Sequence, residues 1–294
     1  VLDYEDRFRH DVMEDFADTY LSGKTPIPCV RCNQTVKFRD LILRAKELDA
    51  DVLATGHYVR YISGKKNAEL HRGINDIKDQ SYFLFATTQE QLNFLRFPLG
   101  GMTKDETRAE AERLDLGVAD KPDSQDICFV PNGNYAEVVK RIRPGSVVPG
   151  EIVDQAENIL GFHQGIINYT VGQRRGLNIG GGHPLYVLKL EPETARVVVG
   201  PKAALLEETV VIDDMNWLGD EPLGKKAVNV TVKIRSTTPL LPATLRAKNS
   251  GGAEINLHTP YIGVAPGQAC VFYDGDRMLG GGWIVCKNSE ITSK

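Results

Sequence analysis

Residues 51–58 read DVLATGHY, a short apolar run that ends on a glycine and a histidine. This run predicts a buried strand that leads into a loop. Upstream of it, residues 3–20 and 36–48 carry apolar side chains at helical spacing, and each stretch predicts an amphipathic helix. Downstream, a capping box at residues 103–106 (TKDE) predicts a helix that runs to about Leu116. Helices on both sides of a buried strand indicate part of a doubly wound α/β sheet.

The texture of the sequence changes after about residue 144. Short runs rich in β-branched residues then alternate with glycine and proline, which is typical of small β domains and predicts a barrel at the C-terminal end. We expect three domains: an incomplete doubly wound α/β domain over 1–143, a β-rich central domain over 144–207 and a C-terminal β-barrel over 208–294. The runs are YVLKLE (186–191), RVVVG (196–200), AVNVTVKIR (227–235), ATLRA (243–247), AEINLHT (253–259), ACVFYDG (269–275) and GGGWIVC (280–286).

The composition is ordinary for a soluble globular protein, because 41% of the 294 residues are hydrophobic and 25% are charged. It excludes disorder and collagen-like repeats. The sequence has no run of about 18 apolar residues, so we expect no membrane span and no membrane partner. The opening residues VLDYEDRFRH lack the features of a signal peptide, and without an initiator Met we expect further chain upstream. Five cysteines, an odd number, favour a reducing and hence cytoplasmic location.

Basic residues are unevenly distributed along the chain. The net charge of −4 argues against a nucleic-acid partner, but attraction to phosphate is local and is screened beyond about 10 Å. The segment 221–248 has six basic residues against one acid, Glu221. One such cluster is as typical of a solvated surface as of a phosphate-binding one. The six are Lys225, Lys226, Lys233, Arg235, Arg246 and Lys248.

Residues 28–33 read PCVRCN and contain a CxxC motif. Such a pair is half of a zinc site, a thioredoxin-like redox pair, a reactive thiol with a neighbour, or simply structural. A full zinc ribbon needs a second CxxC, which this sequence lacks. The motif precedes the helix expected at 36–48, so we expect Cys32 to gain thiolate character from the helix N-terminus and from Arg31.

Other polar stretches lie where ligands are expected. Gly56 and His57 follow the predicted strand at its C-terminal end, where open α/β sheets bind ligands, although a lone buried histidine is the commoner role. Cys128 lies between a polar and an apolar run, which is equally typical of a core cysteine. Three further stretches are a polar loop at 78–81 (KDQS), an arginine- and glycine-rich loop at 168–177 (NYTVGQRRGL) and a turn at 265–268 (APGQ) that leads into a barrel strand.

Together these stretches resemble one family, the tRNA-specific 2-thiouridylases, which place sulfur on the wobble uridine of certain tRNAs. The resemblance covers essentially the whole chain in the right order, and its motifs are highly specific. The matching segments are 25–38 (TPIPCVRCNQTVKF), 54–58 (ATGHY), 78–83 (KDQSYF), 121–129 (KPDSQDICF), 169–182 (YTVGQRRGLNIGGG) and 265–273 (APGQACVFY).

The resemblance implies an ATP-pyrophosphatase-like α/β domain and a sulfurtransferase reaction. ATP, with Mg²⁺, adenylates the C2 oxygen of the uridine. The resemblance makes Cys128 the carrier of a persulfide received from a cysteine desulfurase or a sulfur-relay protein. Cys32 then closes a disulfide with Cys128 to release the sulfur. This order of events is chemically reasonable, because the uridine oxygen is a poor leaving group until it is esterified and one thiol can expel the other.

The resemblance also implies contacts with the two substrates. Gly56 is expected to touch ATP. The target base, which must leave its stack, is expected in a pocket formed by Ile27, Pro28 and Cys29. The basic segment 221–248 is expected to position the RNA through its phosphates, and the family expectation is tRNAs for Lys, Glu and Gln. Residues expected to contact tRNA are His57, Lys78, Asp79, Gln80, Arg235, Ser236 and Gln268.

The sequence departs from the family pattern in two places. It has no Ser-Gly-Gly-x-Asp-Ser phosphate loop, so this stretch alone is expected to bind ATP poorly. Cys29 stands where many relatives have an Asp that has been assigned an acid/base role, which puts proton handling in doubt. Three cysteines at one site, Cys29, Cys32 and Cys128, also suggest a [4Fe–4S] cluster with one open iron.

Three alternatives to the thiolation reading stay open. The chain is a tRNA-binding module without catalysis, a CxxC oxidoreductase, or a synthetase of the wider ATP-pyrophosphatase group that acts on a small molecule. The last is disfavoured by the β-rich C-terminal half and by the SQDIC motif.

Overall fold

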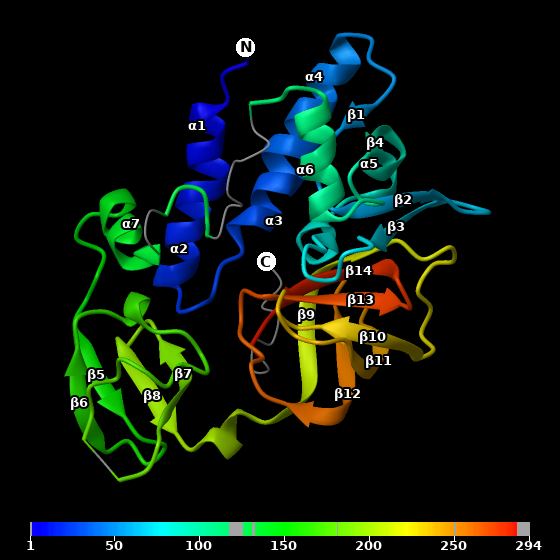
Figure 1. Ribbon diagram of the computed structural model, residues 1–294. Helices are drawn as coiled ribbons and strands as arrows, with labels where there is room; N and C mark the ends of the chain where they lie inside the picture. The colour runs from blue at the N-terminus through cyan, green and yellow to red at the C-terminus, as the bar shows by residue number, and fades with distance from the viewer. Residues whose placement is uncertain (1, 118–125, 131–132, 181, 250, 287–294) are drawn as a thin grey trace.

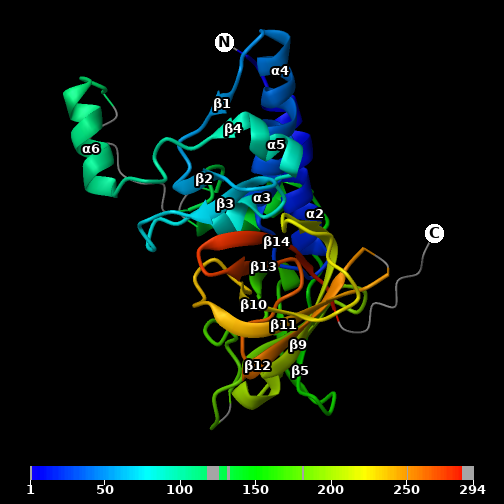
Figure 2. The ribbon, with the colours of Figure 1, turned by 90° about the vertical axis from the view of Figure 1, so that its right-hand side faces the viewer.

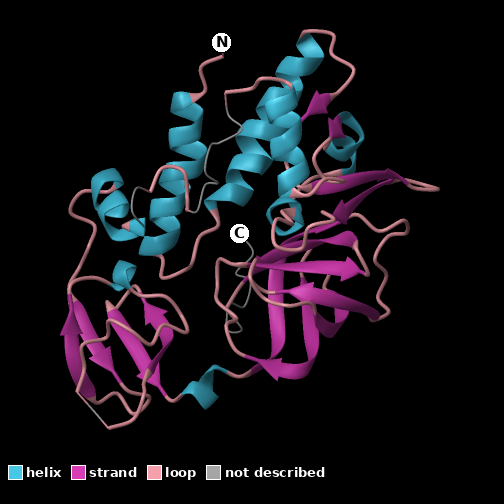
Figure 3. Ribbon diagram, viewed as in Figure 1, coloured by secondary structure: helices cyan, strands magenta, loops and turns pink. Residues whose placement is uncertain are grey.

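The computed structural model describes residues 2–117, 126–130, 133–180, 182–249 and 251–286. A group of helices with a small sheet is followed along the chain by a four-stranded sheet and then by a barrel (Figure 1). Figure 3 shows that the long helices gather at one end with a short strand pair beside them, and that the other strands form two separate groups. This arrangement confirms the predicted fold class, an α/β part followed by two β-rich parts.

Two long helices begin the chain, and each contains a π-helical segment. The first, as predicted for residues 3–20, consists of α1 (Glu5–Phe8), η1 (Arg9–Glu14) and α2 (Asp15–Leu21). The second consists of α3 (Pro28–Cys32), η2 (Asn33–Asp40) and α4 (Leu41–Glu47).

The predicted start of the second helix, at residue 36, is wrong. The helix begins at Pro28, since proline suits a first helical turn, where its missing N–H is not needed. The CxxC motif therefore lies inside the helix and not before it.

The strand predicted within 51–58 is present but is shorter and less buried than expected. β1 (Leu53–Ala54) pairs in parallel with β4 (Leu95–Arg96), and these two strands form a sheet of their own. Leu53 is half-buried and Ala54 is exposed, so the prediction of a buried strand is wrong. The reason is that, in the part of the chain that the structure describes, no third strand flanks the pair.

Two capped helices follow. Thr88 opens α5 (Gln89–Phe94) and Thr103 opens α6 (Lys104–Arg113), each with a complete capping box. The predicted capping box is confirmed, but the helix ends at Arg113 and not near Leu116, because Asp115 adopts a left-handed conformation (φ 51°). Helix α6 has no buried residue and stands apart from the rest of the molecule in Figure 2.

The central part consists of one helix and a four-stranded sheet. Helix α7 (Tyr135–Ile142) leads into β5 (Gly150–Val153), β6 (Ile159–His163), η5 (Ile166–Asn168), β7 (Tyr186–Glu191) and β8 (Arg196–Gly200). The strand order is β6-β5-β8-β7, and Ile152, Val187 and Val197 form its core with no exposed surface. A short 3-10 turn, η6 (Lys202–Leu205), connects this sheet to the barrel.

Six strands close the C-terminal barrel. They are β9 (Glu207–Trp217), β10 (Val228–Lys233), β11 (Leu241–Ala247), β12 (Ala253–Tyr261), β13 (Ala269–Asp274) and β14 (Arg277–Ile284). β13 pairs with both β10 and β14, which closes the circle, so the predicted barrel is confirmed. Gly280 (φ 127°) is required at its place, because a Cβ there would lie 2.1 Å from the carbonyl oxygen of Asn216.

A hairpin from the N-terminal part extends the barrel sheet. β2 (Val59–Ser63) and β3 (Ala68–Arg72) pair with each other, and β3 pairs with β14 through Leu70 and Met278. Both of those side chains are fully buried in one core that also contains Val30, Phe38 and Tyr273. The helix that carries the CxxC motif and the barrel therefore share a hydrophobic core.

Candidate active site

The CxxC cysteines lie on the first turns of α3. Cys29 and Cys32 are three residues apart and therefore face the same side of the helix. Cys29 reaches the surface, whereas Cys32 is partly buried. Just before them, Ile27 and Pro28 are buried, so of the three residues predicted to line the base pocket only Cys29 presents an exposed side chain.

Cys128 comes to the same place from a distant part of the sequence. Its neighbour Phe129 packs edge-on against Phe8 (ring centroids 5.8 Å apart) and Phe16 (5.2 Å) of the first helix. Asp126 accepts a hydrogen bond from the hydroxyl of Tyr135 (2.7 Å), which ties the segment to α7. Residues 121–125 of the predicted motif lie outside the described residues.

The three thiols influence one another electrostatically, and all three are free. Neighbouring groups desolvate Cys29 and raise its pKa, with Cys128 and then Cys32 adding to the rise. Burial also raises the pKa of Cys32. The expectation that Cys32 gains thiolate character is therefore wrong, because desolvation disfavours the charged form.

Arg31 does not lower the pKa of Cys32, contrary to the prediction from the sequence. Its guanidinium lies 3.5 Å from the Asp15 carboxylate and stacks on the Trp283 ring (4.8 Å to the centroid). The cation that opposes the rise in both thiol pKa values is Lys37, which the sequence reading missed. Its signal was present in the quoted run 25–38, where Lys37 follows Cys32 by five residues.

The barrel fixes the approach to the cysteine helix. The backbone N–H of Thr25 donates to the carbonyl of Pro266 (2.8 Å), and the Gln268 amide donates to the carbonyl of Thr25 (3.3 Å). Gly267 (φ 87°) permits this approach, since a Cβ there would lie 2.8 Å from the Thr25 oxygen. The turn predicted at 265–268 is confirmed, and it lies against the chain just before the CxxC motif.

Gly56 and His57 follow β1, as predicted, but the histidine is buried. The Nδ1 atom of His57 lies 2.8 Å from the Thr55 hydroxyl, and its ring packs edge-on against Phe38 (5.8 Å) and Phe97 (6.4 Å). Burial lowers the pKa of His57 to about 4, so the imidazole is neutral at pH 7. The structure places this ring against the cysteine helix and leaves it almost no exposed surface for a tRNA contact, which stays a prediction.

Asp79 is the centre of a buried polar cluster between the N-terminal part and the barrel. Its carboxylate has no exposed surface and accepts hydrogen bonds from the backbone N–H groups of Gly73 (3.2 Å) and Ser81 (3.1 Å). The Arg72 guanidinium lies 3.4 Å from it, and the ammonium of Lys233, on β10, lies 3.7 Å away. The structure therefore gives Asp79 an internal role that the sequence reading did not foresee.

Lys78 and Gln80, on either side of Asp79, are also predicted to contact tRNA. Gln80 accepts a hydrogen bond from the backbone N–H of Tyr58 (2.8 Å), which joins this loop to the one that carries His57. Lys78 is half-buried. Their predicted contacts with tRNA stay predictions.

Three residues of the barrel part are predicted to contact tRNA. Arg235 and Ser236 follow β10, and Gln268 precedes β13. Arg235 donates to the backbone carbonyls of Gly263 (2.7 Å) and Val171 (3.1 Å), and burial lowers its pKa. It thereby joins the barrel to the arginine- and glycine-rich loop of the central part. Ser236 and Gln268 are both partly exposed.

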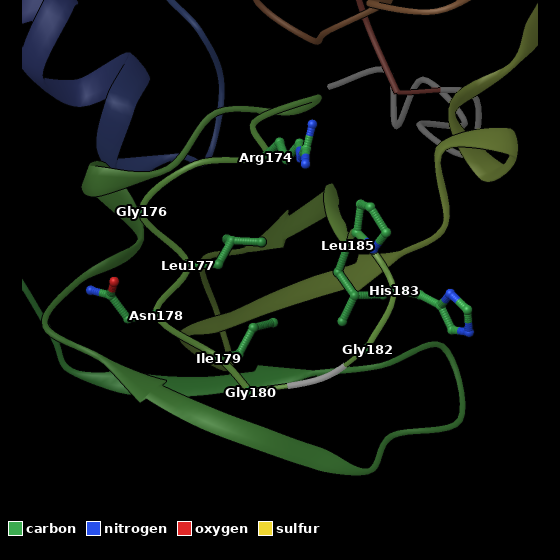
Figure 4. A pocket seen from close by; sticks show the side chains of 10 residues that line it. Arg174, Gly176, Leu177, Asn178, Ile179, Gly180, Gly182, His183 and Leu185 are labelled. Carbon is green, nitrogen blue, oxygen red and sulfur yellow. The ribbon is translucent and has the colours of Figure 1, made fainter.

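A cavity of about 340 Å³ lies in the central part, away from the cysteines. Leu177 and Ile179 line it, while Arg174 stands at its rim and the imidazole of His183 points away from it (Figure 4). This cavity contains none of the predicted catalytic residues.

Within the described residues, no group of three or more His, Cys, Asp or Glu is arranged to hold a metal ion. Cys29, Cys32 and Cys128 all belong to these residues, so the structure gives no support to the predicted iron–sulfur ligand set. Iron and acid-labile sulfide analysis of anaerobically purified protein tests that prediction directly. In the same part of the chain no helix is long and apolar enough to cross a membrane.

Comparison with known protein families assigns each of the three parts of the chain to a domain family. Residues 1–132 match the family model of the tRNA methyl transferase HUP domain, 136–201 that of the tRNA methyl transferase PRC-barrel domain, and 207–284 that of the aminomethyltransferase beta-barrel domain. This succession accounts for the α/β part, the central sheet and the closed barrel.

The curated relatives identify the family. The chain is 62% identical over 288 residues to the tRNA-specific 2-thiouridylase MnmA of Paracoccus denitrificans, and 60% identical over 293 residues to that of Rhodospirillum centenum. In both comparisons 97% of this chain aligns with 74% of the relative. The chain belongs to the tRNA-specific 2-thiouridylase family.

Proposed function

We propose that this protein converts the wobble uridine of tRNA to 2-thiouridine, using ATP to activate the base and a cysteine persulfide as the sulfur donor. The observation that carries the proposal is that three free thiols from two distant segments lie close enough for Cys128 to help raise the pKa of both Cys29 and Cys32. Cys29 and Cys32 lie on α3, and Cys128 lies almost a hundred residues later on a segment anchored by Phe129.

The proposed reaction has three bond-making steps. ATP transfers its adenylyl group to the C2 oxygen of the uridine and releases pyrophosphate. The terminal sulfur of a Cys128 persulfide then attacks C2, and the C2–O bond breaks as AMP leaves with the electron pair. Finally the Cys32 thiolate attacks Sγ of Cys128, which forms a Cys32–Cys128 disulfide and leaves the transferred sulfur on the uridine. A thiol reductant resets the disulfide.

The raised thiol pKa values fit this order of events. A protonated Cys32 is a poor nucleophile and does not reduce the persulfide before the base arrives. Cys128, the proposed persulfide carrier, is exposed and therefore open to a sulfur donor. The same pKa values argue against a thioredoxin-like oxidoreductase, whose attacking cysteine has a lowered pKa.

The tRNA is proposed to bind through phosphate contacts from the basic segment 221–248, with the target base turned out of its stack. The expected substrates are the tRNAs for Lys, Glu and Gln, and the expected sulfur source is a cysteine desulfurase or a relay protein. Gly56 is proposed to contact ATP with its Mg²⁺ at the end of β1. The chain is proposed to divide into domains at 1–143, 144–207 and 208–294.

A thiolation assay on the full-length protein tests the proposal. Unmodified tRNA, ATP, Mg²⁺ and a persulfide donor are incubated with the wild type, Cys128→Ser, Cys32→Ser and the control Cys286→Ser, and 2-thiouridine is measured by mass spectrometry. We expect ATP-dependent product from the wild type and the control, none from Cys128→Ser, and no multiple turnover from Cys32→Ser. Normal tRNA binding without any product from the wild type would contradict the proposal and favour a binding module.

A further inference from the structure

Lys37 lies near the CxxC cysteines and near His57 in the loop that follows β1, since its charge acts on all three. It follows Cys32 by five residues in a segment that is π-helical, from Asn33 to Asp40. A π-helix closes its hydrogen bonds between residues five apart, so Lys37 is turned less far from the side of Cys32 than in an α-helix of 3.6 residues per turn. The next residue, Phe38, packs its ring on His57 (5.8 Å).

Lys37 differs from every other cation of its helix. Arg31 lies 3.5 Å from Asp15, Arg39 lies 2.6 Å from Asp11, Arg44 lies 2.6 Å from Glu47, and Lys46 lies 3.0 Å from Glu90. Lys37 alone has no carboxylate partner among the described residues, although its side chain is partly buried. A partly desolvated ammonium without a counter-charge favours an anionic ligand.

The groups around Lys37 are neutral or weakly acidic. Its charge acts on the thiols of Cys29 and Cys32 on one side and on the imidazole of His57 on the other. The described acid on the Cys128 segment, Asp126, already accepts hydrogen bonds from the Tyr135 hydroxyl and from the backbone N–H of Ile127 (both 2.7 Å). Among the described residues, Lys37 is the cation whose charge acts on both the thiols and His57, so an anion that binds near them would meet it.

We propose that the Lys37 ammonium binds the phosphate that activates the uridine, and holds it between the β1 loop and the cysteines while sulfur attacks. In the proposed reaction the phosphate of the adenylated base lies between the loop that carries Gly56 and His57 and the attacking sulfur, and the charge of Lys37 acts on both sides of that gap, on His57 and on the thiols. When the C2–O bond breaks, the phosphate of the departing AMP gains negative charge, which a fixed ammonium stabilises. This inference rests on the proposed function, since it names a ligand of the same site.

Two measurements on the full-length protein test it, with the variants Lys37→Met, Lys37→Arg and the control Lys46→Met on the same helix. The first is equilibrium binding of AMP, which does not depend on thiolation. We expect Lys37→Met to weaken AMP binding about tenfold, Lys37→Arg to recover most of the loss and Lys46→Met to resemble the wild type. An AMP affinity that is the same in the wild type and Lys37→Met overturns the proposal.

The second measurement separates the two sources of phosphate. Binding of tRNA without ATP is expected to change less than about twofold in Lys37→Met, while single-turnover thiolation slows on the order of 100-fold. If tRNA affinity falls and AMP affinity does not, the ligand of Lys37 is a backbone phosphate and the assignment is wrong. If the wild type binds AMP through Lys37 but makes no 2-thiouridine, the proposed function fails and the phosphate site stands. Circular dichroism of Lys37→Met and Lys37→Arg shows whether the helix is intact in both variants.

Discussion

The C-terminal barrel and the sheet of β1 and β4 differ in how their sheet edges are arranged: the barrel is closed, and the small sheet is open. The barrel closes six strands on themselves, and five of the six residues of β13 are buried. The sheet of β1 and β4 has two residues in each strand, and Ala54 is exposed. A closed sheet satisfies its own backbone groups, whereas a short open one depends on what packs against it.

The candidate active site belongs to the open end but is anchored to the closed one. The hydroxyl of Tyr82 donates to the carbonyl of Ala269 (3.1 Å) and accepts from that residue's N–H (3.2 Å). The amide of Asn216 donates to the carbonyls of Phe85 and Thr87, both at 2.7 Å. We infer that the barrel is the rigid reference against which the cysteine helix is held, and each prediction below tests one part of that contrast.

The largest effect is expected in the barrel core. Phe272 on β13 has no exposed surface, so Phe272→Ala is expected to cost about 4 kcal/mol of unfolding free energy through lost burial and a cavity. Leu43→Ala, at an exposed position of α4, is the control and is expected to cost less than about 0.5 kcal/mol. Urea unfolding followed by tryptophan fluorescence measures both, since Trp217 and Trp283 lie on β9 and β14. Similar losses in the two variants would contradict the contrast.

The next effect is expected where the two ends meet. Asp79→Asn leaves Arg72 and Lys233 buried without their shared counter-charge, which is expected to cost about 3 kcal/mol. The control is Asp76→Asn, which removes an exposed partner of Arg72 and is expected to cost less than about 0.5 kcal/mol. If Asp79→Asn lowers tRNA affinity and leaves unfolding unchanged, Asp79 is a surface contact after all.

Local patterns predicted the barrel better than they predicted the site. The β runs at 186–191, 196–200, 243–247 and 269–275 each coincide with a strand, because alternation and turn residues are encoded within a few positions. The three-residue spacing of the two cysteines was visible in the same local way.

Features of the site that depend on contacts between distant parts of the chain could not be predicted from the sequence. Nothing around residue 79 signals that a barrel lysine, Lys233, approaches its carboxylate, since more than 150 residues separate the two. The thiol pKa of Cys32 was predicted from its helix and from Arg31, but burial and the engagement of Arg31 with Asp15 decide it. The π-helical segment that turns Lys37 towards the side of Cys32 also has no sequence signal that we can name.

A third effect concerns acid, and it is expected at the open end. The pKa of His57 in the folded protein is about 4, below its ordinary value of 6.5, so the unfolded chain takes up the proton first as the pH falls. The contribution of neutral His57 to the free energy of unfolding is therefore complete above pH 6.5 and is lost as the pH falls towards 4. Between pH 7.5 and pH 5 the free energy of unfolding is expected to fall by about 2 kcal/mol from this group. Urea unfolding followed by circular dichroism at both pH values measures the loss. His57→Phe is expected to remove that share of the pH dependence, and an unchanged dependence would show that other groups cause it.

The smallest effect compares two threonine caps in different surroundings. Thr88 opens α5 in a capping box with Gln91 and Thr103 opens α6 in one with Glu106, but α5 buries Leu92 whereas α6 has no buried residue. Replacing either threonine by alanine is expected to destabilise its own helix by about 1 kcal/mol. Because α5 is packed against the core, Thr88→Ala is expected to lower the global unfolding free energy by that amount. Because α6 is not, Thr103→Ala is expected to leave the global value unchanged and to reduce hydrogen-exchange protection only within residues 104–113. Equal global losses would mean that α6 is coupled to the fold through contacts beyond the described residues.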